Sequence, residues 1–356
     1  MDDDEDWCGN PWEDEPEPPA ERRSASSGER QKAAAERLLI PLARAQDAVA
    51  RLEASVAASP PDVAAGLRAR LALFEAGGFL AHHGAAVHPH DLALRDARLT
   101  GSFALAVITG RLKQEAPWTT AEGGDDAVAD DHLVAHALAY ARHWRRLAEL
   151  ATVQPLKSIE ALASPLSQLG AHLADDETTR AWLGSLPGPA ECPGLLTACA
   201  ITATGLPGME REDRLDLAPS YVAASLWRRH GYGRSCALPF WSTPVSRIDA
   251  LAGKGGGEFD RLYLDCVAEA AQRGARELDR LQLAARRIAA LPGSARSRLH
   301  EAGAMALREP LITGRLLANR LDVSARAGLD LADRLVQAGV VRELTGRSAW
   351  RAFTAI

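Results

Sequence analysis

Residues 311–356 constrain the fold of this chain more than any other segment. Thr313 is a suitable N-cap for a short helix over Gly314–Leu321, because its hydroxyl can accept a bond from a free backbone N–H. Ser324 is placed in the same way to cap a further helix that ends at Gly339. Two short helices joined by a tight turn predict a helix-turn-helix.

Small and apolar side chains at fixed positions in these helices support that prediction. Ala318 falls at the fifth position of a helix-turn-helix, where the two helices must approach closely, and Gly328 falls at another internal position that accepts a small residue. The apolar residues expected to fill the space between the helices are Leu317, Leu321, Val323, Leu331 and Leu335. The pattern therefore predicts both helices and their packing.

A β-hairpin is predicted to follow these helices and to complete a winged helix. Its strands cover 340–344 and 349–354, and the glycine of Thr345-Gly346-Arg347-Ser348 can adopt the positive φ that a tight turn needs. A first helix is expected over Ala295–Leu307, and Pro292-Gly293 is the expected domain boundary. The module is therefore a helix-turn-helix with a small β-hairpin wing.

The residues upstream are predicted to form a multi-helix body, which makes the fold class mainly α. Apolar residues recur at helical spacing, and β-branched alternation is scarce. The expected helices cover about 31–59, 62–75, 102–114, 127–151, 159–173, 220–230 and 258–291. Gly77-Gly78 should end the second helix, 117–126 should be a loop, and 185–218 should be loop with brief helices. The expected domains are 1–30, a disordered acidic tail, 31–291, a helical body, and 294–356, the winged helix.

Charge is distributed unevenly along the chain. The net charge is −6, yet residues 1–30 carry eleven acids against three arginines, whereas residues 295–356 carry ten arginines against six acids, a net +4. A basic C-terminal module suits binding to double-stranded DNA. An arginine-rich proteome that decorates every protein surface would give the same count, so this alternative stays open.

The winged-helix pattern assigns DNA-binding roles to particular residues. Ser324 and Arg326 begin the helix expected to enter the groove, where Arg326 would reach a base edge or a phosphate. Arg315 and Arg320 would hold phosphate. The wing arginines expected to grip the adjacent backbone are Arg342, Arg347 and Arg351. One such helix covers only a half-site, which favours a homodimer.

The helix that begins after Ser324 also carries features that oppose DNA binding. Only one arginine lies early in it, and Asp330 and Asp333 would face, or lie near, a polyanion. A winged helix that binds another protein is therefore the alternative hypothesis. If the module binds DNA, the chain is predicted to be a transcriptional or plasmid-associated regulator.

Other features of the sequence exclude several classes of protein. No apolar run is long enough to cross a membrane, and the acidic N-terminus does not suit a signal peptide, so a cytoplasmic protein is expected. Five cysteines stand apart without a Cys-x-x-Cys motif, as expected for reduced thiols. Residues 253–257 lack the phosphate-loop pattern and are expected to form a hinge.

Two groups of histidines were considered as metal sites. The spacing of the densest group matches no known site; it comprises His82, His83, His88, His90 and Asp91. His132 and His136 lie one helical turn apart, but the glutamate of His-Glu-x-x-His is missing, so a polar helix face is expected. No metal and no cofactor are therefore expected.

The C-terminal run resembles two known groups of proteins. The segment Ser324–Phe353, with Ala338-Gly339-Val340-Val341-Arg342-Glu343-Leu344-Thr345-Gly346-Arg347 at its centre, resembles the C-terminal winged helix of many Fic-domain proteins. Together with His88–Ala97 and Phe259–Leu278, it also resembles an uncharacterised, often plasmid-borne family of soil-bacterial proteins. In that family a domain of unknown function precedes a helix-turn-helix DNA-binding domain. The resemblance implies a helical body, a DNA-binding tail and no known activity.

The Fic resemblance does not extend to the catalytic motif. Fic enzymes carry His-Pro-Phe-x-Asp/Glu-Gly-Asn-Gly-Arg, and the nearest fragment here is His230-Gly231-Tyr232-Gly233-Arg234, which lacks the acid and the asparagine. This fragment is expected to be a helix end and loop. The alternative to a DNA-binding regulator is thus a protein–protein interaction module on a catalytically inactive Fic-like helical scaffold. The sequence gives no positive indication of an enzyme.

Overall fold

Helix α2 (Pro61–His82) is the element on which most of the helical body packs. The computed structural model describes residues 27–97, 131–210, 215–293, 297–345 and 351–356. Leu38–Ile356 form one compact unit, and Met1–Arg37 form another. The predictions for 1–26, 102–114 and 117–126 lie outside the described residues.

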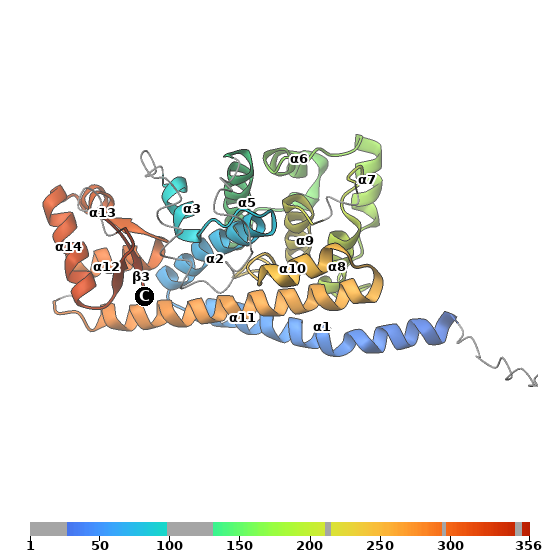
Figure 1. The fold of residues 1–356 in the computed structure, drawn as a ribbon, viewed down its shortest axis with the longest axis horizontal. Coiled ribbons are helices and arrows are strands. Elements are labelled where there is room, and N and C mark those ends of the chain that lie inside the picture. The colour runs from blue at the N-terminus through green and yellow to red at the C-terminus, as the bar shows by residue number, and fades with distance from the viewer. Residues whose placement is uncertain (1–26, 98–130, 211–214, 294–296, 346–350) are drawn as a thin grey trace, which may run out of the picture. The chain divides into compact units, whose positions relative to one another are not determined.

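The described helices confirm the predicted mainly α fold (Figure 1). The helices before residue 200 are α1 (Ser27–Ala57), α2, α3 (Pro89–Asp96), α5 (Asp131–Glu149), α6 (Ile159–Gln168), α7 (Asp176–Ser185) and α8 (Gly194–Thr204), with a 3₁₀ turn at Pro155–Lys157. The later helices are α9 (Leu217–Arg229), α10 (Val245–Ala252), α11 (Gly256–Ala289), α12 (Arg298–Arg308), α13 (Gly314–Leu321) and α14 (Ala325–Gln337). No described helix has the length and apolar character needed to cross a membrane.

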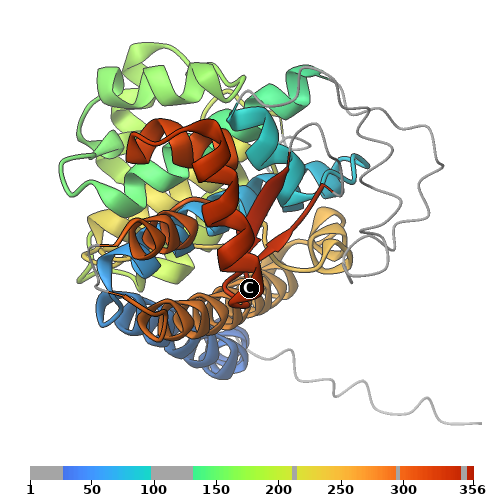
Figure 2. The same ribbon diagram turned by 90° about the vertical axis from the view of Figure 1, so that its left-hand side faces the viewer.

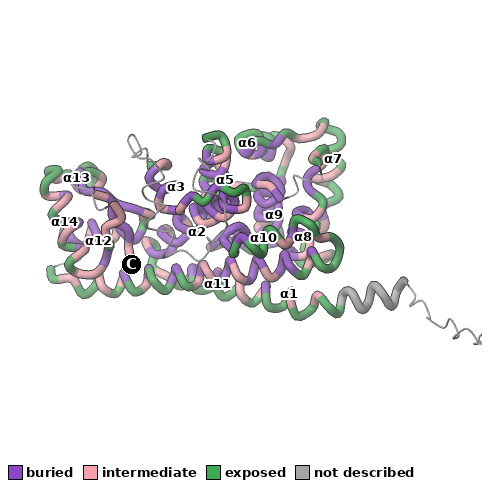
Figure 3. Tube along the Cα trace, viewed as in Figure 1, coloured by how far each residue is buried: buried purple, intermediate pink, exposed green. Residues whose placement is uncertain are grey.

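Helix α2 is buried along most of its length (Figure 3), with α3, α5, α10, α11 and α12 packed against it. The prediction that it ends at Gly77-Gly78 was wrong, because the helix continues to His82. A Cβ on Gly78 would lie 1.7 Å from the carbonyl oxygen of Trp241, and one on Gly66 would lie 1.8 Å from that of Leu307. These glycines therefore allow close backbone approach and do not end the helix.

The side chain of Glu75 holds the segment 240–242 against α2. Its buried carboxylate accepts backbone N–H bonds from Phe240 and Trp241, at 2.9 and 2.8 Å, and from Ser242 at 2.9 Å. Burial raises the pKa of Glu75, while these hydrogen bonds act in the opposite direction. The carboxylate thus supplies acceptors for three backbone donors that cannot reach water.

Arg70 links α2 to the end of α12. Its buried guanidinium donates to the carbonyl oxygens of Leu307, Ala306 and Glu309, at 2.8, 3.1 and 2.9 Å. The last carbonyls of a helix have no partner within the helix, so Arg70 acts as a C-terminal cap supplied by another element. Its Nε also lies 3.6 Å from a carboxylate oxygen of Glu277 on α11. Desolvation lowers the pKa of Arg70 to about 10, so the group stays charged at neutral pH.

The C-terminal residues form a three-stranded antiparallel sheet with helices α12, α13 and α14 to one side of the strands (Figure 2). Strand β3 (Ala352–Ala355) lies between β1 (Ile312–Thr313) and β2 (Val341–Glu343). Ile312 pairs with Phe353, and Arg342 pairs with Thr354. The sequence did not indicate β1, because a two-residue strand shows no alternation.

Three further helices escaped prediction, namely α3, α7 and α10. The short helix α10 lies between Pro244 and Gly253, in a stretch for which no helix was predicted. The expected boundary at Pro292-Gly293 does follow the end of α11, yet α12 packs on both α2 and α11. Helix α12, the first helix of the C-terminal module, is therefore held by the body.

Replacement of Arg70 should be among the most destabilising changes in the chain. We expect Arg70→Ala to lower the free energy of unfolding by about 3–5 kcal/mol, because Glu277 and the capped carbonyls lose their partner in a buried site. Urea denaturation followed by circular dichroism measures this change. Arg51→Ala is the control, since Arg51 forms an exposed ion pair with Asp47, and its loss should leave the free energy of unfolding nearly unchanged. Equal effects of the two variants would contradict the role given to Arg70.

Alanine substitutions at Gly78 and Gly257 should change the free energy of unfolding in opposite directions. Gly78→Ala should destabilise the protein by about 1–3 kcal/mol or more, because the new methyl group would overlap Trp241. Gly257 lies in the first turn of α11 with open space around it, so Gly257→Ala should stabilise by about 0.5–1 kcal/mol. Thermal unfolding of both variants tests the assignment, and a stabilised Gly78→Ala variant would refute it.

Candidate nucleic-acid interface

The helix-turn-helix forms through the predicted capping residues. Thr313 Oγ1 accepts from the backbone N–H of Leu316 at 3.0 Å, and Ser324 Oγ accepts from that of Ala327 at 3.2 Å. Asp322 between the helices has a φ of 52°, a left-handed conformation that ends α13 abruptly. The turn therefore has the geometry that the sequence indicated.

Close packing of α13 on α14 decides which side of α14 faces outward. A Cβ on Gly328 would lie 2.2 Å from the carbonyl oxygen of Gly314 and 3.1 Å from the Cβ of Ala318. Only glycine fits at this position, which is more restrictive than the small residue that the pattern required. The buried apolar residues around this contact are Leu317, Leu321, Leu331 and Leu335, as predicted, with Val323 partly buried.

The outward side of α14 carries alternating charge. Its exposed residues are Ala325, Arg326, Asp330, Arg334 and Gln337. Arg326 lies 3.2 Å from Asp330 one turn later, and both side chains are largely exposed. Exposed pairs of this kind contribute only about 0–1 kcal/mol, so a phosphate or a base edge could replace Asp330 as the partner of Arg326 at little cost.

Arg351 is held between α14 and β2. Its guanidinium lies 2.7 Å from an oxygen of Asp333 on α14 and 2.7 Å from one of Glu343 on β2. The hydrogen bond to Glu343, followed by the one to Asp333, raises its pKa, and the group also lies 5.0 Å from the ring centroid of Phe353. These contacts fix the hairpin against α14. Arg351 also neutralises Asp333, one of the two acids expected to oppose DNA binding.

The other predicted arginines lie in separate places. Arg315 and Arg320 are exposed on α13 and line a cleft against the body. Arg342 is exposed on β2, close enough to His90 on α3 for its charge to affect that imidazole. Arg347 lies outside the described residues. The end of α13 and the start of α14 place Arg320, Ser324 and Arg326 around one turn, whereas Arg342 and Arg351 belong to the hairpin.

The densest histidine group is divided by the fold. His82 Nδ1 lies 2.7 Å from Asp249 on α10, and His88 Nδ1 accepts the backbone N–H of His90 as the cap of α3. Burial, followed by the charges of His88, Arg342 and Arg70, lowers the pKa of His90. Within the part of the chain that the structure describes, no three or more His, Cys, Asp or Glu side chains are placed to hold a metal ion.

Asp91 was the acid in that group, and it has an unusual environment. Both carboxylate oxygens are buried and have no hydrogen-bond partner. Burial raises its pKa to about 7, against a smaller opposite effect of Arg95. An uncompensated carboxylate of this kind is costly to keep ionised in the folded protein.

One further sequence interpretation is confirmed by the structure. His230 is the C-cap of α9, and Gly231 and Gly233 in the loop that follows have positive φ values, as expected for a helix end and loop. The glycines after α10 form the junction with α11, and the hinge expected there stays a prediction.

Comparison with known proteins gives one positive finding. A family model described as HTH DNA binding domain matches residues 303–356, which span α12 from Gly303 onward, α13, α14 and the sheet. The chain therefore carries a C-terminal helix-turn-helix DNA-binding domain, as the sequence pattern predicted. Among curated proteins, no sequence matches the chain. The resemblance of the upstream residues to a domain of unknown function, and to a Fic scaffold, is not confirmed.

Asp91 should make stability depend on pH. A carboxyl group whose pKa is raised on folding favours the folded state fully below its unfolded pKa, and this advantage is lost as pH rises to about 7. Asp91→Asn mimics the protonated form, so it should be more stable than the unaltered protein at pH 8, by up to about 4 kcal/mol, and much less so at pH 5. Urea denaturation at both pH values gives the difference. The exposed Asp47→Asn is the control, and identical pH dependence with and without Asp91 would contradict this account.

Proposed function

We propose that this protein is a transcriptional or plasmid-associated regulator that binds duplex DNA through its C-terminal winged helix. The observation that carries the proposal is the match of residues 303–356 to a DNA-binding helix-turn-helix, with α14 exposed along one side. The sheet order β1-β3-β2 with a hairpin after α14 supports the winged form. The net positive charge of residues 295–356 supports a polyanionic partner.

In the proposed complex, the start of α14 enters the major groove. Arg326 exchanges Asp330 for a base edge or a phosphate, and the N-terminal end of α14 at Ser324 lies near the DNA backbone. Arg315 and Arg320 have no ion pair with any described residue, so they can bind phosphate without losing a partner. Arg342 and Arg347 of the hairpin extend the contact. Arg351 acts by holding the hairpin in place against α14.

We further propose that the protein binds DNA as a homodimer. One α14 helix reads only a few base pairs, so a single winged helix gives modest sequence specificity. A second copy related by a two-fold axis would place a second helix in the next turn of the groove. Two half-sites about one helical turn apart would then define the site.

A protein-binding role for the winged helix is the second candidate. It is favoured by the exposed side of α14, where Asp330 offsets one of the two exposed arginines, Arg326 and Arg334, and leaves an excess of one positive charge. A face with so little net charge has a weak attraction for DNA compared with most recognition helices. The two candidates differ in their dependence on salt, because only DNA binding releases condensed counterions.

Single substitutions on α14 test the proposed function. Arg326→Ala should weaken binding to a fluorescent duplex about tenfold, because one charge-assisted contact is lost, and should reduce the dependence on salt. Asp330→Asn should strengthen binding, since it removes repulsion from phosphate. Fluorescence anisotropy at 50 and 200 mM salt measures both effects.

The matched control is Arg51→Ala. Arg51 also forms an exposed ion pair one helical turn away, with Asp47 on α1, and its loss should leave the affinity unchanged. Absence of duplex binding at low salt, or binding that does not change with salt, would count against the regulator and favour the protein-binding role.

A further inference from the structure

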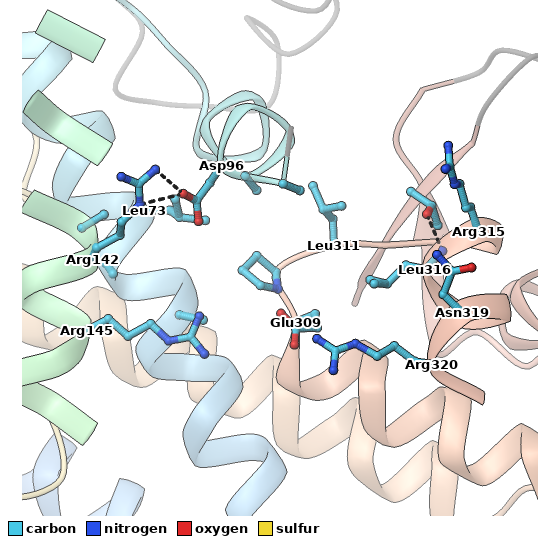
Figure 4. Close-up of a pocket in the computed structure, with 17 residues that line it drawn as sticks. Leu73, Asp96, Arg142, Arg145, Glu309, Leu311, Arg315, Leu316, Asn319 and Arg320 are labelled. Carbon is cyan, nitrogen blue, oxygen red and sulfur yellow. Dashed lines mark hydrogen bonds and ion pairs between the residues drawn. The ribbon is translucent and has the colours of Figure 1, made fainter. Parts of the chain in front are cut away.

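A cleft of about 550 Å³ lies between the helical body and the winged helix (Figure 4). One wall is formed by α2, α3 and α5, and the other by the segment from Glu309 to Arg320. The volume falls within the range of roughly 300–1,000 Å³ that is typical of sites for small molecules. The cleft adjoins α13, the helix that packs most extensively on α14.

Both walls of the cleft contribute apolar side chains to its floor. Ala69, Ala72 and Leu73 contribute from α2, while Leu311 and Leu316 contribute from the winged helix. Small alanine side chains leave the space open, and the leucines give it an apolar surface. Such a lining favours a ligand with a hydrocarbon or aromatic body over a free inorganic ion.

The rim of the cleft carries four arginines. Arg142 and Arg145 come from α5, and Arg315 and Arg320 come from α13. Arg142 donates to Asp96 at 2.8 and 3.0 Å, which uses its guanidinium and neutralises the acid on α3. Arg320, in contrast, has no ion pair with any described residue.

The arrangement of these side chains favours an anion in the centre of the cleft. Figure 4 shows Arg145 and Arg320 reaching into it from opposite walls, whereas Arg315 points away. Arg145 forms an ion pair with Glu149 at 2.7 Å, an i,i+4 contact whose strength is small because both side chains are about one-third exposed. Arg142 and Asp96 neutralise each other, so the charged side chains that remain in the cleft are Arg145, Arg320 and Glu309, which Figure 4 shows between the two arginines. Two positive charges therefore meet one negative charge there.

We propose that this cleft binds a small organic anion, a carboxylate or a phosphate ester with an apolar body, whose charged group lies between Arg145 and Arg320. The apolar body would lie against α2 and Leu316. Arginine suits both kinds of anion, because its planar guanidinium can donate two parallel hydrogen bonds.

Binding of such an anion would oppose binding of DNA, and this part of the inference rests on the proposed function. Arg320 is available to one anionic partner at a time, so an anion in the cleft would remove a phosphate contact. The ligand would also tie α13 to α5 of the body. Because coupling between two sites is reciprocal, DNA would weaken the affinity for the anion by the same factor.

Binding to the cleft can be tested without DNA. The probe is 1-anilinonaphthalene-8-sulfonate, an anion with an aromatic body whose fluorescence rises when it leaves water. We expect saturable binding of one probe per full-length chain, with a Kd about tenfold higher in both Arg145→Ala and Arg320→Ala. Both side chains are on the surface, so the variants should fold. Arg51→Ala is the matched control and should bind the probe unchanged.

Competition defines the chemistry of the ligand. Octanoate should displace the probe, whereas octan-1-ol and inorganic phosphate at the same concentration should not, because each lacks one half of the proposed ligand. Equal probe binding by all three variants would overturn the site. Displacement by octan-1-ol or by phosphate as strong as by octanoate would overturn the ligand class.

A separate measurement tests the coupling to DNA. Saturating octanoate should weaken the binding of a fluorescent duplex, and this effect should be reduced in Arg145→Ala, whose arginine lies on the body. If no duplex binds under any condition, the proposed function fails. The probe titration still shows whether the cleft binds an anion. If duplex binds equally with and without octanoate, the regulatory part of the inference is wrong.

Discussion

The guanidinium of Arg70 satisfies three backbone carbonyls at the end of α12, and the position of the helix-turn-helix domain depends on this contact. The end of a helix presents carbonyl groups without partners, and at a buried end no water can replace them. Here the side chain of Arg70 on α2 donates hydrogen bonds to these carbonyls. Gly66 allows the backbones of α2 and α12 to approach closely. The first helix of the DNA-binding domain is thus oriented by a residue far away in the sequence.

Other contacts reinforce this attachment. Arg287 near the end of α11 donates to the carbonyl oxygens of Gly339 and Ile356, and Thr354 on β3 donates to that of Pro310. Each contact satisfies a carbonyl outside the regular helix and sheet bonds. The C-terminal module is therefore attached to the body or to its own sheet at its first helix, at the turn after α14 and at its last residues.

This attachment gives the charged residues different functions from those their spacing suggests. Arg351 fits the position of a wing arginine, yet Asp333 and Glu343 hold it within the module. Arg320 follows the expected helix, yet it faces a cleft whose other wall is the body. Sequence patterns specify which residues are cationic and on which element they lie. They do not specify which anion lies opposite, since that partner comes from another part of the chain.

The sequence by itself determined the helix-turn-helix, because its signals act over a few residues. Capping by Thr313 and Ser324, the turn at Asp322 and the glycine at position 328 involve only neighbouring backbone and one helix pair. Tertiary structure decided the continuation of α2 through Gly77-Gly78, the strand β1, the burial of Arg70 and Asp91, and the cleft beside α13. These features arise where segments distant in the chain meet. Local spacing carries no information about such meetings, because the stabilising partner of each group is supplied by the packed fold.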